Sequence, residues 1–129
     1  MFKQALEAVR LWFSPWRLRA EGRTPDYRFS LANERTFLAW LRTSLALLAG
    51  GIAVDQFLTG LPTGAGLAVT LLLLVVGALC AVRAVNHWVR SERAMRRGED
   101  LPMSRFPALL SMATVVAAMA VIVAVAVSP

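Results

Sequence analysis

The chain has 129 residues, of which 57% are apolar and 17% are charged, and it carries a net charge of +6. This composition argues against a soluble domain, which at this length would hold fewer apolar and more charged residues. The excess of Lys and Arg does not indicate nucleic acid as a partner, because membrane proteins concentrate these residues on their cytoplasmic side. The composition predicts a single-domain, all-α integral membrane protein.

Residues 1–27 are predicted to form a basic amphipathic helix followed by a linker. Apolar side chains recur at helical spacing, while basic side chains fall on another face. The apolar positions are Phe2, Leu6, Val9, Phe13 and Trp16. Pro15 is expected to end this helix. Such a helix is typical of the membrane interface; the alternative is a helix packed on the cytoplasmic side of the protein.

The remaining residues, 28–129, hold three apolar runs close to the length of about 20 residues that spans a bilayer as a helix. The helices are expected at about residues 33–57, 64–90 and 106–127. The expected N-cap of the first is Ser30 or Asn33. Gly and Pro residues between Leu58 and Gly66 predict a tight turn. The sequence therefore predicts three transmembrane helices, an antiparallel hairpin plus a third helix.

The positions of Lys and Arg predict the orientation of these helices. Seven of the 14 lie in residues 1–35 and six lie in residues 83–105. Residues 55–64 and the tail after residue 127 hold none. The N-terminus and the second loop are therefore predicted to face the cytoplasm, and the first loop and the C-terminus to face the outside.

Three arginines stand out in the first spanning helix. Arg28, Arg35 and Arg42 are spaced by seven residues, so they lie on nearly one helix face. Arg42 lies roughly 9–10 Å inside the apolar run that begins at Thr36. A charge at this depth either reaches back to the lipid headgroups or points into a protein-lined cavity. In the second case, a ring of copies would place arginines around an axis that attracts anions.

Two further groups of residues complete the candidate site. Arg83, His87 and Arg90 are expected to widen its cytoplasmic mouth. Small side chains at helical spacing let helices approach closely, either within the hairpin or between subunits. The predicted packing positions are Ala46, Gly50 and Ala53 in the first helix and Ala113, Ala117 and Ala120 in the third.

The sequence contains no recognisable catalytic or metal-binding constellation. It has one histidine, His87, and one cysteine, Cys80, whereas a metal site requires several converging ligands. It has no glycine-rich phosphate loop and no nucleophile elbow. The sequence therefore predicts a non-enzymatic protein without a metal or a cofactor.

The segment LANERTFLAWLRTSLAL, Leu31–Leu47, closely resembles the signature of the domain-of-unknown-function 202 family. The residues HW at His87-Trp88 and RAMRRGEDLP at Arg93–Pro102 extend the resemblance. This family includes small YidH-like bacterial inner-membrane proteins and the three-helix membrane domain of the eukaryotic vacuolar transporter chaperone (VTC) complex, which makes and translocates polyphosphate. The resemblance covers about residues 28–127 and implies a location in the bacterial cytoplasmic (inner) membrane.

In the VTC complex, five such domains surround a conduit whose basic residues contact polyphosphate. The resemblance implies that Arg28 and Arg35 occupy two of these contact positions, while Arg42 and Arg90 rest on the residue pattern alone. The chain lacks the soluble polymerase and sensor domains of the larger chaperone subunits, so the resemblance does not imply that it makes polyphosphate.

Two functional hypotheses remain open from the sequence. In the first, the protein is an oligomeric module, such as a pentamer, that binds or conducts anions or polyanions such as polyphosphate through a ring of arginines. In the second, it is an accessory or assembly subunit of a membrane complex, and its basic residues serve only topology and lipid contact. The expected partners are membrane lipids, further copies of the chain and a polyanion.

Overall fold

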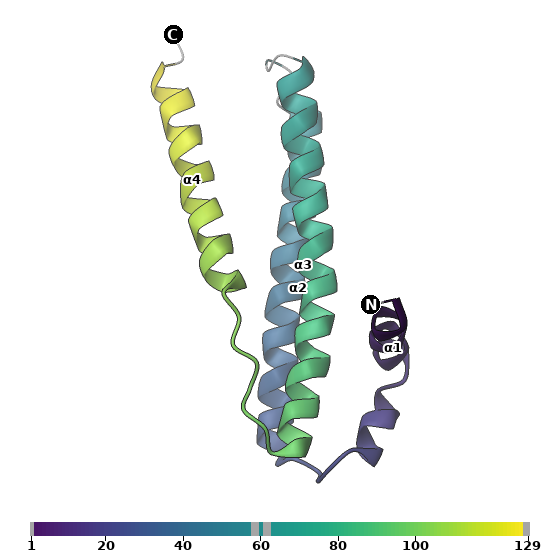
Figure 1. Cartoon of the computed structure of the whole chain (residues 1–129). Helices are drawn as coiled ribbons and strands as arrows, with labels where there is room; N and C mark the ends of the chain where they lie inside the picture. Colours follow the sequence, from purple (N-terminus) through teal and green to yellow (C-terminus); the bar gives the residue numbers. More distant parts are fainter. Residues whose placement is uncertain (1, 58–59, 61–62, 128–129) are drawn as a thin grey trace.

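The computed structural model describes the backbone of residues 2–57, 60 and 63–127, and the side chains of residues 6–7, 9–57 and 64–119. Within these ranges the chain is helical and contains no β-strand. Its elements are α1 (Phe2–Phe13), the 3-10 helix η1 (Pro15–Ala20), α2 (Tyr27–Phe57), α3 (Thr63–Arg97) and α4 (Phe106–Val127). Helices α2 and α3 lie side by side along their length, with α1 and α4 on either side of them (Figure 1).

The pairing of α2 with α3 depends on small and polar residues that let the two backbones approach closely. Ser44, 1% exposed, donates a hydrogen bond from Oγ to the carbonyl oxygen of Gly77 at 2.7 Å. A side chain at Gly77 would begin 3.1 Å from both Leu48 and the Ser44 carbonyl oxygen, and one at Gly51 would meet Leu74 at the same distance. These residues form the seam of an antiparallel hairpin, as the sequence predicts.

Membrane-length apolar helices are present at Tyr27–Phe57 and Gly64–Arg97. Little of either helix is buried within the chain, as expected for surfaces that face lipid. The described part of α4, Phe106–Met119, is also apolar but shorter. The predicted hairpin of two spanning helices is therefore supported, while the third span stays a prediction. The predicted turn from Leu58 to Gly66 falls partly outside the described residues.

Helix α2 begins at Tyr27, six residues before the predicted start at residue 33. Asp26 caps it, because its Oδ1 accepts a hydrogen bond from the backbone N–H of Arg28 at 3.0 Å. The expected caps, Ser30 and Asn33, bond instead to α3: Ser30 Oγ donates to Glu92, and Asn33 Nδ2 donates to the Trp88 carbonyl oxygen at 3.0 Å. The predicted N-cap was therefore wrong: α2 begins upstream of Ser30 and Asn33, and these two side chains instead hydrogen-bond α2 to α3.

Helix α3 continues to Arg97, seven residues beyond the predicted end at residue 90. The extension buries Ser91, Glu92 and Ala94, so it is covered by neighbouring elements and does not fray into water. It ends at Gly98, whose φ of 67° breaks the helical conformation. Helix α4 has the predicted bounds.

The N-terminal segment forms two short helices rather than one helix and a linker. Helix α1 ends at Phe13, next to Pro15, as predicted. The following residues form η1, whose Leu18 is 1% exposed. Trp12 joins α1 to α3 by donating from Nε1 to Oδ1 of Asn86 at 3.2 Å. One edge of α1 therefore packs on α3, whereas Leu6, Val9 and Phe13 are exposed; a position at the membrane interface stays a prediction.

Among the described side chains, helix α4 contacts the hairpin at its first turn. The Phe106 ring packs against Trp40 with centroids 5.3 Å apart, and the Arg83 guanidinium lies 4.9 Å above the Phe106 ring and donates to Ser104. Beyond this point α4 diverges from α2 and α3 (Figure 1). Every described side chain from Pro107 to Met119 is exposed except Leu110. The far end of α4 lies at the same end of the molecule as the C-terminal end of α2 (Figure 1).

Candidate functional site

The three arginines of α2 share the face of the helix that points away from α3. Arg35 precedes the seam residue Ser44 by nine residues, which is about two and a half helical turns and places it on the opposite side of α2. Arg28 and Arg42 lie seven residues to either side of Arg35, and all three are exposed. The hairpin therefore leaves the predicted arginine row uncovered.

Alanines alternate with these arginines at steps of four and three residues. The full set, here called the arginine face, is Arg28, Ala32, Arg35, Ala39, Arg42, Ala46, Ala49 and Ala53, and all eight residues are exposed. Alternating steps of four and three form the contact stripe of one helix against another. The five alanines of this face leave room for another helix backbone to approach, while the arginine side chains extend along its flanks.

The predicted packing residues occupy different places in the structure. Ala46 and Ala53 belong to the arginine face, outside the α2–α3 seam, and a side chain at Gly50 would begin 4.0 Å from Leu73 at the edge of the seam. On α4, Ala113 and Ala117 are exposed, and Ala120 lies outside the described side chains. Packing against another chain through these positions stays a prediction.

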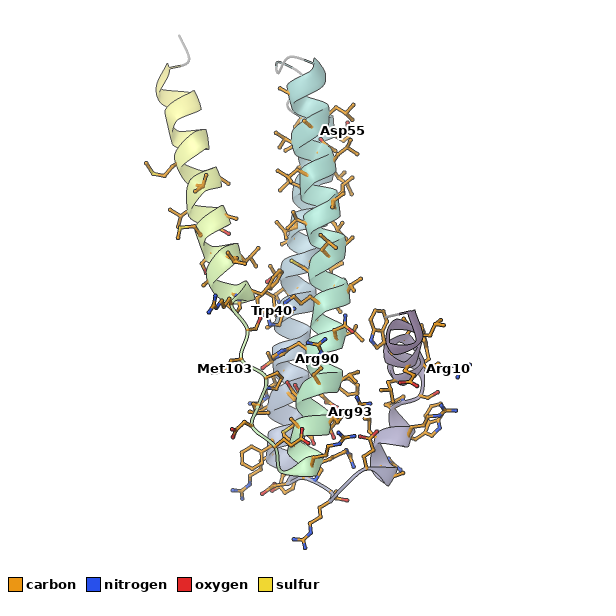
Figure 2. The ribbon with its side chains drawn as sticks, viewed as in Figure 1. Arg10, Trp40, Asp55, Arg90, Arg93 and Met103 are labelled. Carbon is orange, nitrogen blue, oxygen red and sulfur yellow. The ribbon has the colours of Figure 1, made fainter. Side chains whose placement is uncertain are left out.

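Within one chain, His87 and Arg90 do not join the arginine face. His87 is half-buried, 3.5 Å from Ser91 Oγ, and lines a small cavity with Trp40 and Phe106 at the start of α4. Arg90 is exposed and follows the seam residue Gly77 by 13 residues, which turns it about 140° around α3 from α2. Figure 2 shows Arg90 on the exposed surface of α3. Only an arrangement of several chains would bring these two residues near the arginine face.

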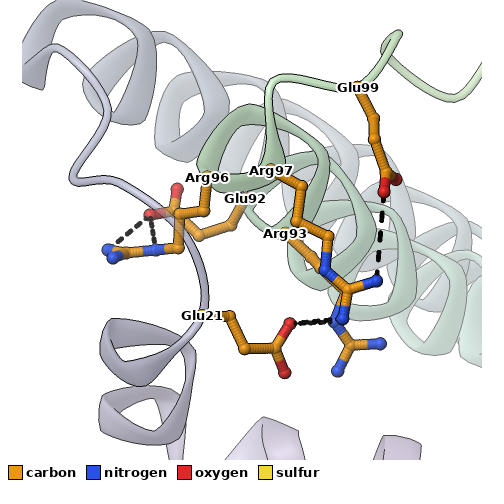
Figure 3. A network of polar contacts seen from close by, with 6 residues as sticks. All are labelled: Glu21, Glu92, Arg93, Arg96, Arg97 and Glu99. Atoms are coloured by element: carbon orange, nitrogen blue, oxygen red, sulfur yellow. Dashed lines mark hydrogen bonds and ion pairs between the residues drawn. The ribbon is translucent and has the colours of Figure 1, made fainter.

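Six charged residues form a network of ion pairs where the chain after η1 meets the end of α3, and this network was not predicted from the sequence (Figure 3). They are Glu21, Glu92, Arg93, Arg96, Arg97 and Glu99. Glu21 contacts Arg93 at 3.1 Å and Arg97 at 2.9 Å. Glu92, only 7% exposed, pairs with Arg96 at 3.0 Å. Glu92 and Arg96 are four residues apart, a spacing that favours an ion pair on one helix face, so this pair could have been predicted from the sequence. These arginines are engaged within the chain, so they contribute less to an anion-binding surface than their number suggests.

A backbone contact supports the same junction. The N–H of Arg23 donates to the Arg96 carbonyl oxygen at 2.9 Å, so the chain leaving η1 lies directly against the last turn of α3. Gly22 makes this approach possible with a φ of 67°. The N-terminal arm, defined as α1, η1 and the residues to Gly22, is therefore fastened to α3 at two points, by Trp12 near its middle and by Glu21 at its C-terminal end.

Among the described residues, no group of three or more His, Cys, Asp or Glu side chains is placed to hold a metal ion. Cys80 is buried on α3 and unpaired among these residues. The described side chains thus form charged surfaces and surfaces suited to helix packing. Of these, the arginine face is the one that the sequence predicted.

Comparison with known proteins gives the chain a family. The model of the family described as "Domain of unknown function (DUF202)" matches residues 28–94, which run from Arg28 to the network at the end of α3. The inner membrane protein YidH of Escherichia coli is 46% identical over 102 residues, covering 78% of this chain and 88% of that protein. The uncharacterized protein Rv2272 of Mycobacterium tuberculosis is 41% identical over 108 residues, covering 81% of this chain and 88% of that protein. No solved structure matches. The matched region and the level of identity show that the chain belongs to the DUF202 family.

Proposed function

We propose that this chain is a non-enzymatic inner-membrane protein that self-associates through the arginine face of α2 and binds or conducts polyanions such as polyphosphate. The observation that supports the proposal is the position of Arg28, Arg35 and Arg42 on one exposed helix face, opposite the hairpin seam and interleaved with alanines. Guanidinium groups bind phosphate oxygens in a planar, two-point geometry, so a row of them suits a chain of phosphates.

A single hairpin cannot enclose such a ligand, and this is why the proposal includes self-association. Copies packed side by side would direct several Arg35 side chains toward one axis. Like charges at that axis repel each other. A bound polyanion would neutralise them, so assembly and polyanion binding are expected to support each other. The alanines of the arginine face would permit the close helix contact that such a ring requires.

The proposed location and topology rest on the relative and on the distribution of charge. YidH is named as an inner membrane protein, and we assign the same membrane to this chain. The proposed topology has three spans, with the N-terminus and the 98–105 loop in the cytoplasm. The far end of α4 lies at the same end of the molecule as the C-terminal end of α2, which agrees with this topology (Figure 1). In it, α1 lies at the cytoplasmic interface with Leu6 and Phe13 toward lipid.

A second candidate function is that of an accessory subunit. The observation that favours it is the exposure of nearly every described side chain of α4 beyond Phe106, which leaves a long apolar surface for a different membrane protein. In this case the basic residues of α2 would serve topology alone. The two functions therefore differ in the role of the α2 arginines: polyanion binding in the first and membrane topology alone in the second.

The proposal is tested by measuring polyphosphate binding to the full chain in nanodiscs. Arg35→Gln is expected to weaken binding about tenfold, the effect of losing one charge-assisted contact. Arg105→Gln is the matched control, because Arg105 is also exposed but lies in the 98–105 loop. Equal weakening by both variants would show a nonspecific charge effect and would contradict the proposed site.

The self-association is tested separately by native mass spectrometry of the same samples. Ala46→Leu places a larger side chain in the arginine face and is expected to break the assembly into monomers, while Leu45→Ala, a neighbouring exposed position, leaves it intact. A wild-type protein that is monomeric, or that binds no polyphosphate as an oligomer, would favour the accessory function.

A further inference from the structure

A cleft begins between η1 and the α2–α3 hairpin and continues as a groove on the surface of the hairpin. Its lower part has a volume of about 360 Å³ and is lined by residues from η1, α2 and α3. Its upper part has a volume of about 300 Å³ and is lined by Glu34, Phe37, Leu38 and Trp88. Glu34 and Trp88 line both parts, so the two adjoin. Together they are here called the arm cleft.

The chemical character of the arm cleft changes along its length. The lower part contains the charged side chains of Arg19, Glu34, Glu92 and Arg96. The upper part is apolar apart from Glu34 and lies where the apolar run of α2 begins. There the ring centroids of Phe37 and Trp88 are 6.5 Å apart. The cleft therefore crosses the boundary between a polar and an apolar layer. This is the profile of a molecule with a charged head and a hydrocarbon chain.

The charges of the lower part are not all used within the chain. Glu92 and Arg96 pair with each other at 3.0 Å. Arg19 and Glu34 are exposed, and no ion pair joins either of them to another described residue. The cleft thus presents one available cation and one available anion. A ligand that carries both signs of charge satisfies both, whereas a purely anionic head would face the carboxylate of Glu34.

We propose that the arm cleft binds one phospholipid with a zwitterionic phosphoethanolamine head. The Arg19 guanidinium would bind its phosphate, and the Glu34 carboxylate would accept hydrogen bonds from its ammonium group. An acyl chain would lie on Phe37, Leu38 and Trp88. Trp16 and Trp88 suit this position because tryptophan is favoured at the level of lipid headgroups. The charged end of the site is separate from the arginine face, since Glu34 is turned about 100° around α2 from Arg35.

Two pairs of variants match each test residue with a control of the same type. Arg17 and Arg19 are both exposed arginines of η1, but only Arg19 lines the arm cleft. Leu38 and Leu45 are exposed leucines of α2, at 55% and 59%, and only Leu38 lines the cleft. A change that acts through folding or general charge would affect both members of a pair equally.

The experiment adds equimolar dioleoyl phosphatidylethanolamine and dioleoyl phosphatidylglycerol to the full chain in detergent and counts retained lipids by native mass spectrometry. The wild type is expected to retain one phosphatidylethanolamine with about tenfold preference. Arg19→Gln and Leu38→Trp are expected to lower its retention about tenfold, whereas Arg17→Gln and Leu45→Trp leave it unchanged. Glu34→Gln is expected to remove the preference between the two lipids.

Equal retention of the two lipids by the wild type would overturn the proposal, as would a loss of retention that is the same in both members of a pair. Retention of phosphatidylethanolamine that no cleft variant reduces would place the lipid elsewhere and would also overturn it. Because the Arg19 and Leu38 pairs act on different parts of the cleft, failure of one variant to fold leaves the other as a test. Polyphosphate binding by the arginine face is expected to be unaffected by Arg19→Gln, because Arg19 lies on η1.

Discussion

Gly22→Ala is expected to detach the N-terminal arm from the end of α3. A Cβ atom at this position would lie 2.0 Å from the Arg96 carbonyl oxygen and 2.7 Å from its carbon, so the two backbones must move apart. The φ of 67° adds a penalty of roughly 1–2 kcal/mol for any side chain. The separation would break the hydrogen bond from the Arg23 N–H to Arg96 and move Glu21 away from its arginine partners.

Hydrogen exchange at the Arg23 amide measures this detachment directly. We expect its protection to fall at least about 30-fold in Gly22→Ala. Gly98→Ala is the control, because Gly98 has the same φ of 67° but nothing lies within 4 Å of its added Cβ. Equal loss of Arg23 protection in both variants would mean that helix-end strain, and not the close approach to Arg96, determines how the arm is held.

Gly77→Leu is expected to separate α2 from α3 at the centre of the hairpin. The first atom of the new side chain would already lie 3.1 Å from Leu48 and from the Ser44 carbonyl oxygen, and the remaining atoms have no space between the helices. The hydrogen bond from Ser44 to Gly77 would be lost as well. We expect the free energy of unfolding in detergent to fall by about 3 kcal/mol, the upper range for overpacking in a tight interior.

Gly64→Leu provides the matched control for the hairpin. Gly64 also lies in α3, but nothing is within 4 Å of its added Cβ. Because Gly64 is in the first turn of α3 and its added side chain meets no neighbour, the replacement is expected to change the free energy of unfolding by less than about 1 kcal/mol. Titration with sodium dodecyl sulfate, followed by circular dichroism, compares the two variants. Similar unfolding midpoints would show that the seam tolerates a large residue and that α2 and α3 pack less closely than described.

The sequence was sufficient to predict the helical hairpin and the bounds of α4, because long apolar runs and glycine-rich turns are local signals. It was not sufficient to predict which small residues form the seam. Ala46 and Ala53 lie at suitable spacing on one face of α2, and Ser44 and Gly51 lie at suitable spacing on another. Either face permits close packing, and only the three-dimensional arrangement shows that α3 covers the second.

The same distinction applies to the candidate site. The step of seven residues predicts that Arg28, Arg35 and Arg42 share a face, since this follows from helix geometry alone. That this face is opposite α3 depends on the choice of seam. The network of Glu21 with Arg93 and Arg97 joins residues more than 70 positions apart, so no local pattern could have indicated it. The longer α3 and the folded arm follow from that network.

The described contacts that attach α4 to the hairpin lie at its first turn, and this has a mechanical consequence. In the proposed topology, α2 and α3 are joined along their length and must tilt in the membrane as one body. Helix α4 is held at one end, so it can change its own tilt without breaking a described contact beyond Trp40 and Arg83. Spanning helices adjust to bilayer thickness by tilting. A thinner or thicker membrane would therefore change the angle between α4 and the hairpin and leave the hairpin itself intact.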